Sequence, residues 1–135
     1  MSAGMRHWAA PYIHRPWQLG AEGPAAYDCW GLVRAVQREH FGRELPPLDA
    51  GLQAITAGWQ PGVSPGRGDG GDIVEMRSAR GPHVGVLIVA DGRDGVLHAV
   101  GHRDADGRDH GDVCFTPIEQ LGALGLGRLR FWRPV

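Results

Sequence analysis

Three short runs of strand-forming residues, separated only by turns, constrain this chain more than any other feature of its sequence. They are Asp-Ile-Val-Glu-Met at 72–76, His-Val-Gly-Val-Leu-Ile-Val at 83–89 and Val-Leu-His-Ala-Val at 96–100. The breaks between them, at 77–82 and 90–95, carry the Gly, Pro and Asp residues of hairpin connections. Because connections this short join antiparallel neighbours, the sequence predicts an antiparallel sheet.

One long helix is predicted before the sheet. Asp28 is a favourable N-cap, apolar residues then recur at helical spacing, and Gly42 supplies a C-terminal stop. These signals predict a helix at about 29–41 that begins at Cys29. A second, weaker helix is predicted over 49–58, after Asp49.

The remaining segments are predicted from their turn and capping residues. The Gly- and Pro-rich stretch at 60–71 and the polar stretch at 102–112 are expected to be loops. Thr116 with Glu119 three residues later resembles a capping box for a short helix. The C-terminal residues before Pro134 are expected to form an edge strand.

Taken together, these elements predict an α+β fold in which a cysteine-bearing helix packs on an antiparallel sheet. A length of 135 residues suits a single domain over 1–135, with an irregular N-terminal arm at about 1–27. The net charge of -1 argues against a nucleic-acid partner, which would require a concentrated basic face.

The chain is expected to lack a membrane span, because no apolar run approaches the roughly 20 residues that cross a bilayer. Its N-terminal residues also lack the apolar core of a signal peptide, so synthesis in the cytoplasm without a secretion signal is expected. Two cysteines, Cys29 and Cys114, make no disulfide framework, which favours a reducing compartment.

Cys29 is the candidate nucleophile. A helix N-terminus favours a thiolate through the macrodipole and its free backbone N–H groups. The same N–H groups can stabilise a developing oxyanion, and Gly31 lets a substrate backbone approach closely. Taken alone, however, Cys29 is equally well interpreted as a packed core cysteine.

His83 and His98 are the candidate bases. Because strand side chains alternate between faces, His83 shares a face with Gly85, and His98 shares one with Val96 and Val100. If that face lies against the helix, both imidazoles can approach the thiol. Separately, each histidine also fits a structural role, at a strand end or in the core, but the combination with Cys29 favours an activated thiol.

A zinc site is an alternative. His98, His102, His110 and Cys114 form His-x3-His and His-x3-Cys pairs, and zinc accepts these ligand types. A zinc ion bound there would leave His98 unavailable to Cys29. The catalytic interpretation, by contrast, requires no metal and no cofactor.

Four motifs resemble the NlpC/P60 family of cysteine peptidases. They are Asp-Cys-Trp-Gly-Leu-Val at 28–33, Gly-Asp-Ile-Val-Glu-Met at 71–76, the run at 83–89 and Leu-His-Ala at 97–99. Arg-Pro-Trp-Gln-Leu-Gly at 15–20 is similar to an upstream family segment in which a tyrosine usually stands at the position of the tryptophan.

The resemblance implies a papain-like fold and hydrolysis of peptidoglycan stem peptides, typically at the D-glutamyl–diaminopimelate bond. It implies that Cys29 is the nucleophile, His83 the general base and then acid, and His98 the orienting group. The Cys29 N–H is the implied oxyanion donor. Asp28, Trp17 and Gly31 are expected to line the substrate or oxyanion site.

The form Asp-Cys-Trp-Gly-Leu-Val-Arg, followed by Glu-Leu-Pro-Pro-Leu at 44–48, resembles the phage-type branch of the family. Members of that branch are cell-wall peptidases encoded with the tail genes of phages and gene transfer agents. The resemblance therefore implies tail or baseplate proteins as partners and incorporation in a phage-like particle. A catalytically silent tail component, which would bind its neighbours through Trp8, Tyr12, Trp17 and Arg-Phe-Trp-Arg-Pro at 130–134, is the structural alternative.

Overall fold

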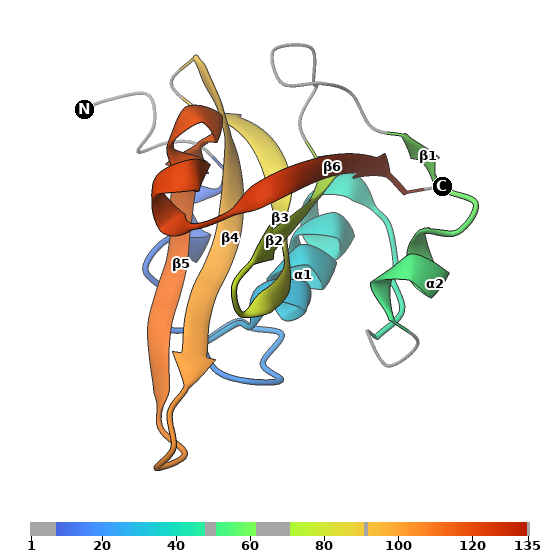
Figure 1. The fold of residues 1–135 in the computed structure, drawn as a ribbon. Coiled ribbons are helices and arrows are strands. Elements are labelled where there is room, and N and C mark those ends of the chain that lie inside the picture. The colour runs from blue at the N-terminus through green and yellow to red at the C-terminus, as the bar shows by residue number, and fades with distance from the viewer. Residues whose placement is uncertain (1–7, 48–50, 62–70, 91, 135) are drawn as a thin grey trace.

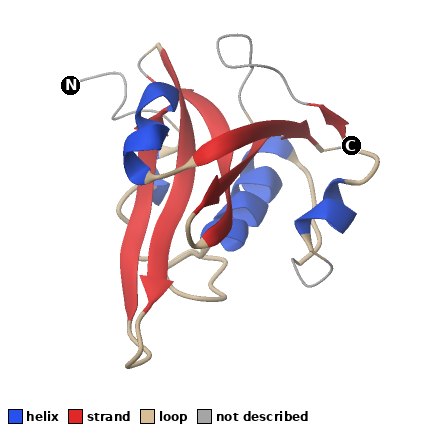
Figure 2. Ribbon diagram, viewed as in Figure 1, coloured by secondary structure: helices blue, strands red, loops and turns tan. Residues whose placement is uncertain are grey.

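One long helix packs against one face of an antiparallel sheet (Figures 1 and 2). The computed structural model describes residues 8–47, 51–61, 71–90 and 92–134. Its helices are η2 (Ala10–Tyr12), α1 (Cys29–Phe41), α2 (Leu52–Thr56) and η4 (Ile118–Leu124), of which η2 and η4 are 3-10 helices. Its strands are β1 (Gln60–Pro61), β2 (Ile73–Ser78), β3 (Gly81–Ala90), β4 (Arg93–Arg103), β5 (Asp109–Pro117) and β6 (Gly127–Arg133). The predicted α+β class is confirmed.

The sheet runs in the order β1-β6-β2-β3-β4-β5, and all its pairs are antiparallel. The predicted pairing of the three central strands is confirmed. The C-terminal strand, however, is not an edge strand, because β6 lies between β2 and the two-residue β1 (Figure 1). The apolar side chains of β6 explain this position, since Phe131 and Leu129 pack into a core on the far side of the sheet from α1.

α1 has the predicted bounds. Its N-cap is Asp28, whose Oδ1 accepts a hydrogen bond from the Gly31 N–H at 2.7 Å. Leu32, Val33 and Val36 are fully buried against the sheet, and each such side chain stabilises the fold by about 1.5–3 kcal/mol. Gly42 ends the helix in the left-handed conformation, with φ of 65°.

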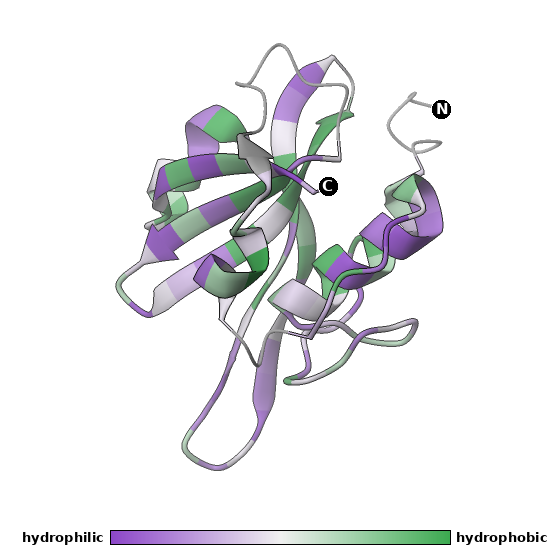
Figure 3. Cartoon of the chain, turned by 90° about the vertical axis from the view of Figure 1, so that its right-hand side faces the viewer, coloured by the Kyte–Doolittle hydropathy of each residue, from purple (hydrophilic) through white to green (hydrophobic). Residues whose placement is uncertain are grey.

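The stretch 102–112 was predicted to be a loop, but most of it is strand. The β4–β5 ladder continues to Arg103 opposite Asp109, so only 104–108 forms the turn. The sequence there lacks the apolar alternation that predicts a strand. Instead, an Arg103–Asp109 ion pair and stacking of His102 on His110 stabilise the end of the hairpin. This end projects from the rest of the chain and is hydrophilic (Figures 1 and 3).

Two other predictions need correction. The second helix spans only Leu52–Thr56 rather than 49–58, and residues 49–50 lie outside the described residues. Of the predicted loop at 60–71, residues 60–61 form β1, and 62–70 are likewise not described. No helix in the described part of the chain is both long enough and apolar enough to cross a membrane.

The N-terminal arm runs along the outer edge of β5. The His14 N–H donates to Val113 O at 2.8 Å, the Val113 N–H donates to Arg15 O at 2.9 Å, and the Trp17 N–H donates to Gly111 O at 3.0 Å. These bonds cover backbone groups that an open sheet edge would expose. The arm thereby also brings Trp17 to the β4–β5 hairpin.

β3 and β4 pair over only part of their lengths. Their ladder begins with Val86 opposite Leu97 and runs toward the turn that joins them. Among the described residues, β3 before Val86 pairs with β2 alone, and β4 beyond Leu97 pairs with β5 alone. The two strands therefore diverge, and the sheet opens between residues 81–85 and 98–103.

Candidate active site

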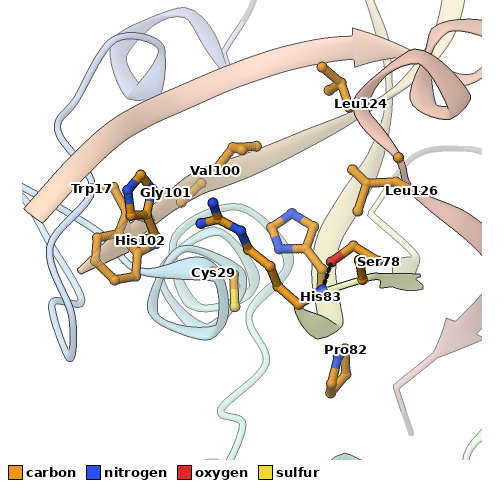
Figure 4. A pocket seen from close by; sticks show the side chains of 14 residues that line it. Trp17, Cys29, Ser78, Pro82, His83, Val100, Gly101, His102, Leu124 and Leu126 are labelled. Atoms are coloured by element: carbon orange, nitrogen blue, oxygen red, sulfur yellow. Dashed lines mark hydrogen bonds between the residues drawn. The ribbon is translucent and has the colours of Figure 1, made fainter. Parts of the chain in front are cut away.

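A cleft of about 600 Å³ lies where β3 and β4 diverge (Figure 4). Cys29 enters it from the first turn of α1, and Arg80 and His83 line it from the β2–β3 hairpin. Residues 99–102 of β4 and 124–126 at the C-terminal end of η4 form further walls. The cleft therefore collects side chains from segments that are distant in sequence, and it contains the predicted nucleophile and the predicted base.

The sulfur of Cys29 lies among backbone donors. The N–H groups of Val84, Trp30 and Cys29 itself act on the sulfur as hydrogen-bond donors, and each lowers the pKa of the thiol. Two of these donors belong to the helix N-terminus, as predicted. Val84 belongs to the stretch of β3 that has separated from β4, so the opening of the sheet also supplies a donor.

Burial nevertheless raises the pKa of the Cys29 thiol above its ordinary value of 9.0, and the negative charge of Asp28 adds to the rise. The sequence led us to expect a thiolate at Cys29, and this is corrected: the helix N-terminus does not by itself keep Cys29 ionised. In this environment the loss of water around the sulfur outweighs the backbone donors. At neutral pH the thiol keeps its proton, so a nearby base must remove it before the sulfur can attack.

His83 belongs to a chain of hydrogen-bonded side chains. Its Nε2 lies 2.9 Å from His98 Nδ1, and the two rings meet edge to face with centroids 5.1 Å apart. His98 Nε2 lies 2.9 Å from the hydroxyl oxygen of Thr116. Because Nε2 of His83 is bound to His98, Nδ1 is the ring nitrogen left for the thiol.

Both imidazoles are neutral at pH 7. Burial lowers the pKa of His83 to about 4. Burial, and then the charge of His83, lower the pKa of His98 to about 3. A neutral imidazole carries one lone pair that can accept a proton, so His83 is in the protonation state of a general base.

The two histidines lie on the face of the sheet away from α1, which corrects the expected geometry. Their strand neighbours Leu87 and Val96 pack in the core beneath η4 and β6, whereas α1 packs on the alternate residues. His83 still reaches the same cleft as Cys29 because the sheet is open there. His98 is fully buried behind His83 and does not line the cleft.

The other predicted site residues divide into one that lines the cleft and two that do not. Trp17 lines it, packed so closely on Gly101 that a side chain at Gly101 would collide with the indole. Gly31 is buried, and a Cβ there would collide with Ala21 O of the arm, so its small size serves packing rather than substrate approach. Asp28 binds the helix N-terminus with Oδ1 and the Gly20 N–H with Oδ2 at 2.8 Å.

The four candidate zinc ligands do not form one site. His98 lies opposite Cys114, and His102 lies opposite His110 four residues further along the hairpin. Both ring nitrogens of His98 have other partners. In the part of the chain that the structure describes, no three His, Cys, Asp or Glu side chains are grouped to hold a metal ion. Neither cysteine forms a disulfide.

Sequence reasoning missed Thr116 and Arg80. Thr116 was predicted to cap a helix, but β5 continues through Pro117, and the Thr116 side chain contacts His98 instead of a helix N-terminus. The available signal was strand alternation: Thr116 is a polar residue two positions after Cys114, and residues two apart on a strand share a face. Arg80 lies in a two-residue turn whose position beside the cleft depends on the divergence of β3 and β4.

The NlpC/P60 family profile matches residues 14–118, most of the 135-residue chain. Comparison with curated proteins finds no matching sequence. The matched region contains Cys29, His83, His98 and Thr116 in the arrangement described above. Members of the NlpC/P60 family are typically cysteine peptidases that act on peptidoglycan, and this chain belongs to that family.

Proposed function

We propose that the protein is a cysteine peptidase that cleaves peptidoglycan stem peptides, with Cys29 as nucleophile, His83 as base and acid, and His98 as orienting group. The observation that carries the proposal is the shared cleft, which holds the Cys29 thiol and a neutral His83 whose Nε2 is bound to His98. A papain-like arrangement, with a helix that carries the thiol and a sheet that carries the imidazole, fits this geometry.

The reaction would proceed by acyl transfer. His83 takes the thiol proton as the sulfur attacks the peptide carbonyl, and the Cys29 N–H stabilises the oxyanion. The imidazolium then protonates the leaving amine as the C–N bond breaks and a thioester remains. His83 next deprotonates a water that attacks the thioester, which releases the carboxylate and restores the thiol.

The lining of the cleft supports an acidic substrate. Among the residues that line it, Arg80 is the cation, and none is an aspartate or glutamate. Stem peptides carry several carboxylates, and the D-glutamyl–diaminopimelate bond lies between two residues with free carboxyl groups. An exposed guanidinium in the same cleft as the thiol favours such a peptide over a neutral one.

We also propose that the enzyme acts within the tail of a phage-like particle, with tail or baseplate proteins as partners. The phage-type form of the residues at 28–34 and 44–48 supports this. The catalytically silent alternative relied on exposed aromatic side chains for binding to neighbours, and two of these side chains have hydrogen-bond partners within the chain. Trp132 Nε1 donates to Glu75 at 2.9 Å, and the Tyr12 hydroxyl donates to Glu39 at 2.7 Å.

The proposed bond is tested by mass analysis of the fragments released from purified diaminopimelate-containing murein. New N-terminal diaminopimelate, with D-glutamate or D-isoglutamine at the matching C-terminus, is the expected product. Fragments cut only in the glycan strands would contradict the peptidase assignment. Cleavage at a different peptide bond would retain the reaction class and overturn the proposed specificity.

A further inference from the structure

The hydrogen-bonded chain behind His83 extends beyond His98. His98 Nε2 lies 2.9 Å from Thr116 Oγ1, and Thr116 Oγ1 lies 3.8 Å from the sulfur of Cys114. His98 pairs with Cys114 across the β4–β5 ladder, and Thr116 is two residues further along the same face. The register of two strands therefore sets the contacts of the buried imidazole.

A neutral imidazole has one N–H and one lone pair, so the pair His83–His98 has two possible proton orders. In the first, the His83 Nε2–H donates to His98 Nδ1, and the His98 Nε2–H donates to Thr116 Oγ1. In the second, the Thr116 hydroxyl donates to His98 Nε2, the His98 Nδ1–H donates to His83 Nε2, and His83 carries its proton on Nδ1. Both orders satisfy the His83–His98 and His98–Thr116 contacts.

Only the first order leaves a base for Cys29. It places the lone pair of His83 on Nδ1, and when Nδ1 takes the thiol proton the existing Nε2–H bond to His98 is kept. In the second order Nδ1 is already protonated, so His83 can accept a proton there only after every proton in the chain has shifted. The direction of the Thr116 hydroxyl therefore decides whether His83 is a base.

Thr116 has the contacts to hold the first order. Its oxygen accepts from His98, while its own proton has the Cys114 sulfur as an acceptor within 3.8 Å. His98 is fully buried, so an Nε2–H without an acceptor would lose its hydrogen bond to water and gain none in return. We propose that Thr116 is a positioning residue that fixes the proton order of His98 and His83 and so leaves the lone pair of His83 Nδ1 for the thiol.

The catalytic role of Thr116 rests on the proposed peptidase function, but the proton order of His83 and His98 can be measured without substrate. Two-bond ¹H–¹⁵N correlation spectra of ¹⁵N-histidine protein at pH 7.5 report which ring nitrogen carries the proton. In the unmodified protein we expect both His83 and His98 to be protonated at Nε2. A His83 proton on Nδ1 in the resting protein would overturn the proposal.

Thr116→Val removes the hydroxyl at nearly constant shape, and Thr116→Ser retains it. In Thr116→Val we expect the His98 proton to move to Nδ1 and alkylation of Cys29, followed by peptide mass mapping, to slow by about tenfold or more as base assistance is lost. Thr116→Ser is expected to keep the proton positions and to stay within about threefold of the original rate. A merely structural residue would change stability without moving the histidine proton.

The outcomes separate this inference from the proposed function. Unchanged proton positions together with unchanged alkylation in folded Thr116→Val would overturn the role of Thr116, even if murein is cleaved. The expected spectra in a protein that does not cleave murein would retain the proton order and reject the peptidase assignment. If Thr116→Val fails to give the circular dichroism of a folded protein, the spectra of the original protein and of Thr116→Ser decide.

Discussion

His83 Nε2 and His98 Nδ1 lie 2.9 Å apart, on the face of the sheet opposite to the helix that carries Cys29. The nucleophile and its base are therefore held by different parts of the fold. α1 positions the thiol, the β2–β3 hairpin positions His83, and the divergence of β3 from β4 lets the two meet in one cleft. Changes to the packing between these strands are expected to affect the reaction without touching Cys29.

Gly85→Ala tests this dependence. A Cβ at Gly85 would collide with the Val96 side chain and lie 2.9 Å from His98 Cβ and from Leu97 O, which is backbone and cannot move aside. We expect a loss of about 1–3 kcal/mol in the free energy of unfolding and a fall in kcat as His98 is displaced. Urea denaturation and murein digestion measure the two effects.

Gly127→Ala is the matched control, because a Cβ there has open space around it. It is expected to leave both the unfolding free energy and kcat close to those of the original protein. If Gly85→Ala also leaves the unfolding free energy and kcat unchanged, the close approach of β3 to His98 does not constrain the site.

The stability of the protein should fall as the solution is acidified. Burial holds the pKa of His83 at about 4, below the 6.5 of an exposed imidazole, and His98 lower still at about 3. The unfolded chain therefore binds more protons than the folded one between pH 6.5 and about 4, so the free energy of unfolding decreases as pH falls through that window. Urea titrations at pH 7.5, 6 and 5 measure the slope.

The double variant His83→Gln, His98→Gln should show a weaker dependence, because it removes both buried titrating groups. A stability that is constant from pH 7.5 to 5 in the original protein would mean that the two rings are not buried in neutral form.

Alkylation of Cys29 should depend on pH as expected for a protonated thiol. Burial raises the pKa of this thiol above 9.0, and the neighbouring imidazole is neutral, so we expect a nearly constant rate from pH 6 to 7.5, where His83 removes the thiol proton during attack, and a rise toward pH 9 as free thiolate forms. Peptide mass mapping after iodoacetamide treatment separates modification at Cys29 from that at Cys114. A rate that rises about tenfold per pH unit throughout this range would instead mean that only free thiolate reacts and that His83 gives no assistance.

The Arg80 side chain should contribute to binding of acidic peptides. Arg80→Gln removes the cation that lines the cleft, and because the residue is exposed we expect KM for a stem peptide to rise only about threefold, with little change in kcat. Arg77→Gln, at an exposed position of β2 outside the cleft lining, is the matched control. If kcat falls by a larger factor than KM rises, Arg80 contributes to the chemical step rather than to substrate binding.

The local elements were largely predictable from the sequence. The bounds of α1 follow from a capping aspartate, helical apolar spacing and a terminal glycine, all within one stretch of chain. The hairpin partners of the central strands follow from short connections. Such signals act between residues close in sequence, so no knowledge of the distant packing is required.

The geometry of the site was less predictable, because it depends on contacts between distant segments. Strand alternation showed that His83 and His98 share a face but not which face α1 covers. The opening between β3 and β4 left no local sign, and Thr116 carried a convincing helix-capping pattern although it lies on a strand. The balance between burial and backbone donors at Cys29 likewise requires the folded environment.

The central claim is that Cys29 and His83 perform a peptidase reaction, and release of soluble peptides from purified murein tests it most directly. Cys29→Ala and His83→Ala should each reduce release to the level of a protein-free sample, and His98→Ala should reduce it less completely. Arg38→Ala on the exposed face of α1 and His14→Ala on the exposed arm are controls expected to retain the original rate. Folded Cys29→Ala that still releases peptides at the original rate would contradict the account.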